Sequence, residues 1–534
     1  MKKLLLFCIL TGYSSVFAQT ELVFVYFTDK PNKAAFFANP LSELTQKSLN
    51  RRSTLGIPLN DQDAPIEQAY LQNLQNLGFI VTDYSKWLNG AAVNATPAQI
   101  IALQAQPFVL SVESFAKNTS TTTKQTPPKK GNDQISTNKI LTNFNYGSGS
   151  AQIDQVNIRP LHLAGFTGTG ISIAVIDSGF PTVNTGAAFS KIWNNNQIKG
   201  GYDFVTKTND IYNTSLNPHG SAVLGAIGGY IENTFVGAAP DADFYLYRTE
   251  NSSVEIPEEE LYWIEAAEEA DRKGVEIITS SLGYNVFDDP KYNYTYTDMN
   301  GSTSFIARAA GIAAEKGIFV LAAAGNSGDK PWHYLLTPSD NVNVFSIGGV
   351  DSAGTSSLFS SFGPNSLGIV KPDGSAQGTN TTTVLDNATI TVNGTSIAAP
   401  IAAGGVACFI QAFPNMNREQ IRLKLRQTAS LFPNHTDQIG YGILNFGSIY
   451  TAALNTSEIS KKEQMSIYPN PVKNILNIAS EHDLQWLEIY DSLGRLIRKS
   501  GHQKTLHVED LTKGTYYLKI QIKNQSYYEK FIKG

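Results

Sequence analysis

One serine in the segment "NGTSIAAP" has surroundings that suggest chemistry. Ser396 lies there just before an apolar run, and this run predicts a helix with Pro400 in its first turn. A serine at the N-terminus of a helix has free backbone N–H groups and the positive end of the helix dipole beside it. A serine hydroxyl attacks a carbonyl only when a base activates it. Taken alone, Ser396 therefore fits a helix N-cap as well as a nucleophile.

A base and a carboxylate lie elsewhere in the chain. His219, in "NPHGSAV", stands at the start of a predicted helix, where the dipole disfavours a charged imidazole. Asp177 directly follows the apolar strand 171–176, and a carboxylate buried there requires a partner. Each residue also has a purely structural interpretation, His219 as a core histidine and Asp177 as an Asx-turn or cap residue.

A fourth polar residue follows another apolar strand. Asn326 ends the segment "IFVLAAAGN", and its amide could stabilise either a turn or a developing oxyanion. In open α/β sheets, functional groups gather beyond the carboxyl ends of the strands. The four residues therefore predict an acyl-transfer site only if they act together.

The order Asp, His, Asn, Ser along the chain resembles the arrangement in subtilisin-like serine proteases, in which Asp precedes His and His precedes Ser. The segments that carry this resemblance extend through almost all of residues 150–455; they are "AVIDSG", "HGSAV", "VGAAPDA", "SSLG", "AAAGNSG", "FSSFGP" and "GTSIAAP". Two mild departures are Ile397, where the family usually has Met, and Ser221, where Thr is commoner. Neither departure removes a catalytic atom.

The resemblance implies a role for each residue. Ser396 attacks the peptide carbonyl, His219 accepts and returns the proton, and Asp177 orients the imidazole. Asn326 and the backbone N–H of Ser396 form the oxyanion hole. Two further segments resemble the edges that bind extended substrate and line the first specificity pocket; they are Ser281, Leu282 and Gly283, and Ala323, Ala324 and Gly325. The floor of that pocket, and so the side-chain preference, is not predicted.

The elements around these residues predict an α/β fold. Near-continuous apolar strands are expected at 171–176, 244–247, 275–278, 318–321 and 342–347, as in a parallel sheet buried on both faces. Between two of them, an acidic first turn, a basic last turn and Gly274 predict a helix that begins near Glu258. We expect a subtilisin-like three-layer parallel sheet with helices on both faces.

Composition divides the chain further. We expect a signal peptide (1–18), a propeptide-like α/β domain (19–117), a linker (118–149), the peptidase domain (150–455), a second linker (456–464) and a C-terminal all-β domain (465–534). The 19–117 segment resembles the family's inhibitory propeptide in position, size and strand–helix pattern. Its expected elements are a strand at 22–27, helices at 66–77 and from Thr96, and a strand at 108–112.

The last 70 residues predict a small β-sandwich of short strands. Strands are expected at 476–478, 487–490, 505–508, 516–522 and 527–532. The segments "MSIYPNPVKNILNI", "LEIYDSLGRLIRK" and "LTKGTYYLKIQ" resemble the sorting domain that the type IX secretion machinery of Bacteroidota reads. This resemblance implies passage through the periplasm to the medium or the outer-membrane surface. A carbohydrate-binding or adhesive β-sandwich is the alternative.

Bulk properties limit the partners. The net charge of −5 over 534 residues offers no basis for nucleic-acid binding, and we expect no membrane span after the signal segment. Of the two cysteines, Cys8 lies in the signal segment, so Cys408 has no partner and is expected to be buried.

We expect a monomer that acts on protein or peptide substrates and requires no cofactor. Structural calcium occurs in the family, but no acidic loop with convincing ligand spacing indicates it here.

Three alternatives remain at this stage. An adhesin built on an inactive protease scaffold would not need to keep all four residues. An α/β-hydrolase esterase would carry a G-x-S-x-G turn with its His after Ser, but no such turn is present and the candidate His219 precedes Ser396. An acid-active serine–carboxyl protease would have Glu in place of His219. The sequence therefore favours a secreted serine endopeptidase.

Overall fold

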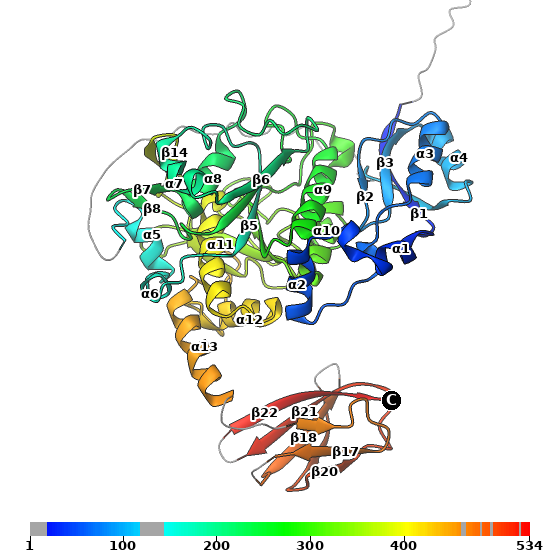
Figure 1. Ribbon diagram of the computed structural model, residues 1–534, viewed down its shortest axis with the longest axis vertical. Coiled ribbons are helices and arrows are strands. Elements are labelled where there is room, and N and C mark those ends of the chain that lie inside the picture. Colours follow the sequence, from blue (N-terminus) through cyan, green and yellow to red (C-terminus); the bar gives the residue numbers. More distant parts are fainter. Residues whose placement is uncertain (1–18, 118–143, 461–465, 481–482, 492–494, 523–524) are drawn as a thin grey trace, which may run out of the picture. The chain divides into compact units, whose positions relative to one another are not determined.

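The computed structural model describes residues 19–117, 144–460, 466–480, 483–491, 495–522 and 525–534. It divides into two compact units, Met1–Ile449 and Tyr450–Gly534, and each is described by itself. Figure 1 labels the helices and strands of both units. The signal segment 1–18 and most of the first expected linker lie outside the described residues.

A seven-stranded parallel sheet forms the centre of the first unit. In spatial order its strands are β13 (Gly374–Gln377), β12 (Phe345–Val350), β11 (Phe319–Ala323), β10 (Ile277–Ser280), β5 (Ser172–Asp177), β9 (Asp243–Arg248) and β6 (Ile198–Asp203). After β5, the chain adds β6 and β9 on one side of it and then β10, β11, β12 and β13 on the other. The strand order therefore reverses between β5 and β10. Such a switch point opens a crevice at the carboxyl ends of the strands.

The five predicted strands are all present in this sheet, with bounds shifted by one to three residues. The sequence did not predict β6 and β13. Both contain glycine and polar residues, in "IKGGYD" and "GSAQ", and lack the apolar run that marks the central strands.

Helices cover both faces of the sheet (Figure 1). The helices of this unit that follow the N-terminal lobe are α5 (Ser150–Gln155), α6 (Arg159–Leu163), α7 (Ser190–Asn194), α8 (His219–Gly228), α9 (Glu258–Lys273), α10 (Phe305–Glu315), α11 (Thr395–Ala412) and α12 (Arg418–Thr428). Helix α13 (Phe446–Ser460) begins in this unit and continues into the second. The predicted helix near Glu258 is α9, which ends at Gly274 in the left-handed conformation, as expected. Two hairpins complete the unit, β7 (Tyr230–Ile231) with β8 (Phe235–Val236) and β14 (Thr381–Leu385) with β15 (Ala388–Val392).

Helix α11 is buried in the centre of the unit. A Cβ at Gly404 would lie 2.4 Å from Ala238 and one at Gly405 would lie 2.3 Å from Phe446, so only glycine permits this packing. Cys408 is a buried free thiol, as predicted. Within the described residues, α11 is the one helix that is long and apolar enough to cross a bilayer, and 89% of it is buried inside the protein.

Residues 20–117 form a small α/β lobe. Its antiparallel sheet has the order β2 (Tyr84–Ser85), β3 (Gly90–Ala95), β1 (Glu21–Phe27) and β4 (Val109–Ser114). Its helices are α1 (Lys33–Ala38), α2 (Gln46–Leu55), α3 (Gln68–Asn76) and α4 (Pro97–Gln104). The predicted cap at Thr96 is present, since Thr96 and Gln99 form a capping box. The sequence did not predict α1 and α2.

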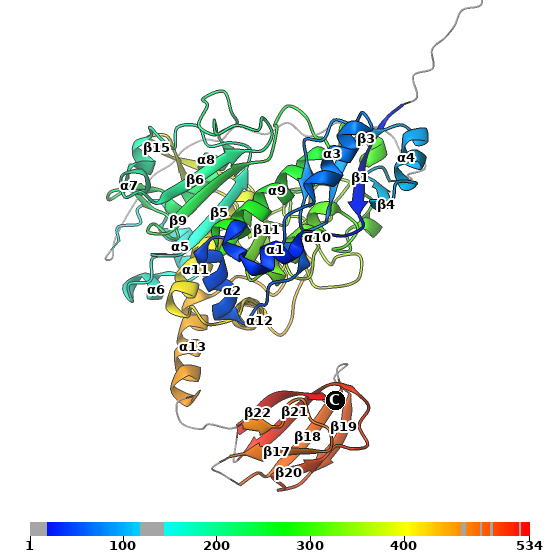
Figure 2. The same ribbon diagram turned by 45° about the vertical axis from the view of Figure 1, so that its right-hand side comes forward.

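This lobe packs on α9 and α10 (Figures 1 and 2). Phe115 of the lobe stacks on Phe305 of α10 with 3.9 Å between ring centroids, and Phe24 lies 5.5 Å from the same ring. Ser85 Oγ donates to Glu268 Oε1 of α9 at 2.6 Å. Apolar and polar contacts therefore join the lobe to one helical face of the first unit.

The second unit contains two β-sheets. One has the order β16 (Ser466–Tyr468), β17 (Ile475–Ala479), β20 (Thr505–His507), and the other β19 (Leu496–Ser500), β18 (Trp486–Asp491), β21 (Gly514–Ile522), β22 (Gln525–Lys533). They enclose an apolar core that includes Leu476, Ile489 and Leu518. The five expected strands are present, and β16 and β19 are additions.

The second expected linker begins within a helix. Helix α13 continues to Ser460 and so includes residues 456–460 of that linker. This stretch is polar, but it contains neither proline nor glycine, so nothing in it ends the helix. Residues 461–464 lie outside the described part of the chain.

Candidate active site

Asp177 is the last residue of β5, at the switch point of the sheet, and is 2% exposed. Its Oδ1 accepts hydrogen bonds from Ser178 N at 2.7 Å and from His219 Nδ1 at 2.8 Å. These donors stabilise a carboxylate that burial alone would make costly.

His219 is the first residue of α8, and its side chain is about one-quarter exposed. The local turn is held by its backbone N–H, which donates to Asn217 Oδ1 at 2.9 Å. A Cβ at Gly220 would lie 2.4 Å from Gly179 O and 3.0 Å from Asp177 Cβ, so glycine is needed for α8 to approach β5 this closely. Because Asp177 engages Nδ1, the Nε2 atom is available for a proton from another group.

Ser396 is the second residue of α11 and is 8% exposed. Its carbonyl accepts a hydrogen bond from Ser281 Oγ at 2.8 Å. In the described part of the chain, no hydrogen bond joins Ser396 Oγ to His219. Catalytic hydrogen bonds of free enzymes are often long and tighten only when substrate binds.

Asn326 and Ser396 approach each other at Gly394. A Cβ at Gly394 would lie 2.7 Å from Ser396 Oγ and 3.5 Å from Asn326 Nδ2, so both polar atoms border this glycine. Asn326 Oδ1 accepts hydrogen bonds from Thr395 N at 3.0 Å and from Thr395 Oγ1 at 2.9 Å. Since Oδ1 is fully used, Nδ2 is the atom left to donate into the site. The sequence analysis did not identify Thr395; its only signal was its place in "GTSIAAP".

The two expected substrate-binding edges follow neighbouring strands. Residues 281–283 follow β10, and residues 323–325 end and follow β11. Both segments lie at the carboxyl ends of their strands. Asp177 lies at the carboxyl end of β5, and β5 pairs with β10 on the side opposite to β11. The sheet thus brings residues from three distant parts of the sequence to one edge.

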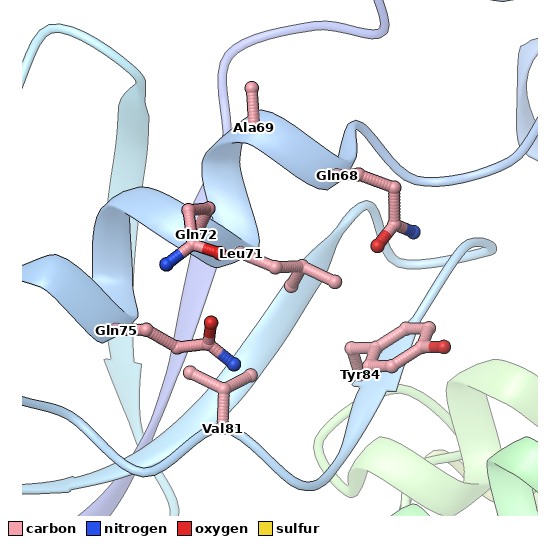
Figure 3. Close-up of a pocket in the computed structure, with 7 residues that line it drawn as sticks. All are labelled: Gln68, Ala69, Leu71, Gln72, Gln75, Val81 and Tyr84. Carbon is pink, nitrogen blue, oxygen red and sulfur yellow. The ribbon is translucent and has the colours of Figure 1, made fainter.

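A separate pocket lies on the small lobe, between α3 and the segment that contains Val81 and Tyr84 (Figure 3). It is lined by Gln68, Ala69, Leu71, Gln72, Gln75, Val81 and Tyr84. None of the residues predicted for catalysis or substrate binding lines it, so it has no part in the site described above.

Three acidic side chains form a cluster near Tyr284. The carboxylate oxygens of Glu250, Glu255 and Glu259 lie within 4.8 Å of one another. Tyr284 Oη donates to Glu250, and Asn251 N donates to Glu259 at 2.7 Å. Burial, and next the charge of Glu250, raises the pKa of Glu259 to about 10.

The fold has known counterparts. The epidermin leader peptide processing serine protease from Staphylococcus aureus superimposes with a TM-score of 0.55 at 16% identity, over 82% of this chain and 99% of that one. At this identity the likeness establishes the fold alone, which is that of a subtilisin-like serine protease.

Sequence comparison gives the family. Residues 168–443 match the model of the subtilase family. The chain is 29% identical to subtilisin DY of Bacillus licheniformis over 56% of this chain and 94% of that protein, and 28% identical to alkaline elastase YaB of Bacillus sp. (strain YaB) over 66% and 77%. The chain belongs to the subtilase family and is a subtilisin-like serine endopeptidase.

Both flanking segments also match family models. Residues 22–132 match the peptidase S8 propeptide domain of Bacteroidota, and residues 466–534 match the secretion system C-terminal sorting domain. The small lobe therefore belongs to a propeptide, and the β-sandwich directs type IX secretion to an extracellular or cell-surface location. These matches confirm both resemblances noted in the sequence.

Proposed function

We propose that the chain hydrolyses peptide bonds through Ser396, His219 and Asp177, with Asn326 in the oxyanion hole. Ser396 Oγ attacks the carbonyl carbon while its proton passes to His219 Nε2. The C–N bond then breaks as His219 gives that proton to the leaving amine, which leaves an acyl group on Ser396. Water, deprotonated by His219, hydrolyses this ester and restores the enzyme.

The observation that carries the proposal is the 2.8 Å contact of His219 Nδ1 with Asp177 Oδ1. It holds the imidazole in the tautomer whose Nε2 can accept a proton. The hydrogen bonds from Thr395 to Asn326 add support, because they leave an amide N–H beside Ser396 for the negative charge of the intermediate.

The edges 281–283 and 323–325 would bind the substrate backbone as additional strands. We further propose that the propeptide is removed on activation and that the sorting domain is recognised by the type IX machinery. The mature enzyme would act as a monomer and require no cofactor.

The test is hydrolysis of casein by the mature chain and by a chain with Ser396→Ala. We expect hydrolysis by the first and a loss of at least about 10⁴-fold in the second, with an unchanged melting temperature. An inactive adhesin on a protease scaffold is the competing function. It would be supported if the correctly folded mature chain hydrolysed nothing.

A further inference from the structure

One short segment, Leu336–Thr337, forms hydrogen bonds with both of the proposed substrate-binding edges. Leu336 N donates to Ala324 O at 3.0 Å, which ties the segment to the edge after β11. Its next residue, Thr337, bonds to Tyr284 in both directions, at 2.9 and 3.3 Å, which ties it to the edge after β10. The segment therefore crosses from one edge to the other.

The side chain of Leu336 lies between the two edges. A Cβ built on Gly283 would lie 2.9 Å from Leu336 Cβ. A Cβ built on Gly325 would lie 2.8 Å from Leu336 Cγ and 3.0 Å from its Cδ1. Leu336 thus occupies the space into which a side chain at either glycine would point. Leu336 itself is half-buried.

We propose that Leu336 is the floor of the first specificity pocket and restricts the enzyme to small, uncharged side chains at the acyl side of the cleaved bond. This inference rests on the proposed function, since it assigns residues 281–283 and 323–325 to substrate binding. The side chain of Leu336 fills the space that a phenylalanine, leucine or lysine of the substrate would need. Glycine, alanine and serine fit above it.

The physical basis is steric. Two glycines in facing edges would normally leave room for a large side chain, but here one leucine contacts both of them. Forcing a larger group into a filled space strains the packing, and one methylene in an apolar pocket changes kcat/KM by about 10- to 200-fold. No charged side chain takes part in these contacts of Leu336, so nothing in them favours a basic residue.

The test uses tetrapeptide p-nitroanilides that differ only in the last residue, which is Ala, Ser, Phe or Lys. We expect the mature enzyme to prefer Ala over Phe by at least about 10-fold in kcat/KM. Leu336→Gly should raise the ratio of kcat/KM for Phe to that for Ala by about 100-fold. Leu336→Met, which conserves volume, should keep the original preference, as should Leu367→Ala at an exposed position.

Preference of the unaltered enzyme for Phe or Lys would overturn the proposal, as would an unchanged Ala-to-Phe ratio in Leu336→Gly. If that variant does not fold, the cleavage sites of the unaltered enzyme in a denatured protein mixture decide, by mass spectrometry. Enrichment of Gly, Ala and Ser before the cut supports the role of Leu336, and its absence contradicts it. Failure to cleave any peptide, together with no labelling of Ser396 by a phosphonate, would instead refute the proposed function.

Discussion

Asn326 and Thr395 are joined by two hydrogen bonds, both accepted by Asn326 Oδ1, although 69 residues separate them in the sequence. The pair fixes which end of the Asn326 amide faces Ser396. A single threonine thereby orients the oxyanion donor and also precedes the proposed nucleophile in the chain.

Asn326→Ala should lower kcat by about 10²–10³-fold with little change in KM, because the lost hydrogen bond forms in the transition state. Thr395→Val should lower kcat less, since Asn326 is kept and loses only the hydrogen bond from the threonine hydroxyl, while the backbone N–H of residue 395 still donates to Oδ1. Steady-state kinetics on one peptide substrate measures both. Equal kcat for Asn326→Ala and the unaltered enzyme would remove Asn326 from the oxyanion hole.

The propeptide lobe is anchored by buried charges at the C-terminal ends of α9 and α10. Arg51 and Arg52 of α2 pair with Asp271 of α9, and Asp63 pairs with Arg52 at 2.8 Å and with Lys316, just after α10, at 2.9 Å. All five side chains are at most 2% exposed. Burial alone would raise the pKa of the Asp63 carboxyl, but Arg52 and Lys316 outweigh it and hold that pKa below its usual value.

Asp271→Asn should weaken docking of the lobe by about 3–5 kcal/mol, because it leaves the buried Arg51 without its carboxylate partner. Arg52→Met should weaken docking less, because Asp271 keeps Arg51 and Asp63 keeps Lys316. Hydrogen exchange at residues 266–275 in the unprocessed Ser396→Ala chain measures this as faster exchange. Arg272→Ala is the matched control, since Arg272 pairs with Glu269 of its own helix and is 40% exposed. The anchor would be ruled out if all three variants exchanged like the parent chain.

His162 is a buried histidine outside the proposed catalytic site. Tyr146 Oη contacts its Nδ1 at 2.7 Å, and burial lowers its pKa to about 4 from the ordinary 6.5. A lowered pKa means that the folded chain favours the neutral ring. Its contribution to stability is therefore complete above pH 6.5 and is lost as the pH falls from there towards 4.

The difference corresponds to about 3 kcal/mol of unfolding free energy. Urea unfolding of the Ser396→Ala chain at several pH values measures it, without self-digestion. His162→Gln should flatten the pH dependence below 6.5, whereas His435→Gln at an exposed loop should not. The same slope in His162→Gln as in the parent would show that another group causes the acid sensitivity.

Chelation tests the expectation that no metal is required. The carboxylates of Glu250, Glu255 and Glu259 are the one acidic cluster with suitable spacing in the described residues, and protein donors occupy two of them. EDTA should therefore leave the melting temperature and activity unchanged. A fall in melting temperature that calcium reverses, and that Glu255→Gln abolishes, would assign a metal to this cluster.

The proposed site could be predicted from sequence because its residues stand where local patterns are strongest. Asp177 and Asn326 each follow an apolar strand, and His219 and Ser396 each begin an apolar helix. Parallel strands bring such ends together, so their positions in the sequence indicate their positions in space.

Features that depend on distant pairs were not predictable. Helix α2 has little apolar periodicity, because its buried face carries Arg51 and Arg52, whose partner Asp271 lies more than 200 residues away. The roles of Leu336 and Thr395 also depend on contacts between segments remote in sequence, which no local pattern reveals.

The most direct test of the central claim is labelling with a peptidyl phosphonate that reacts with activated serines. Mass spectrometry of the mature chain should locate one phosphonyl group per molecule, on Ser396, and peptide hydrolysis should fall in proportion to labelling. Asp177→Asn should label far more slowly, because its imidazole is no longer held in the reactive tautomer. A label on another residue, or full labelling of Ser396 with hydrolysis intact, would contradict the account.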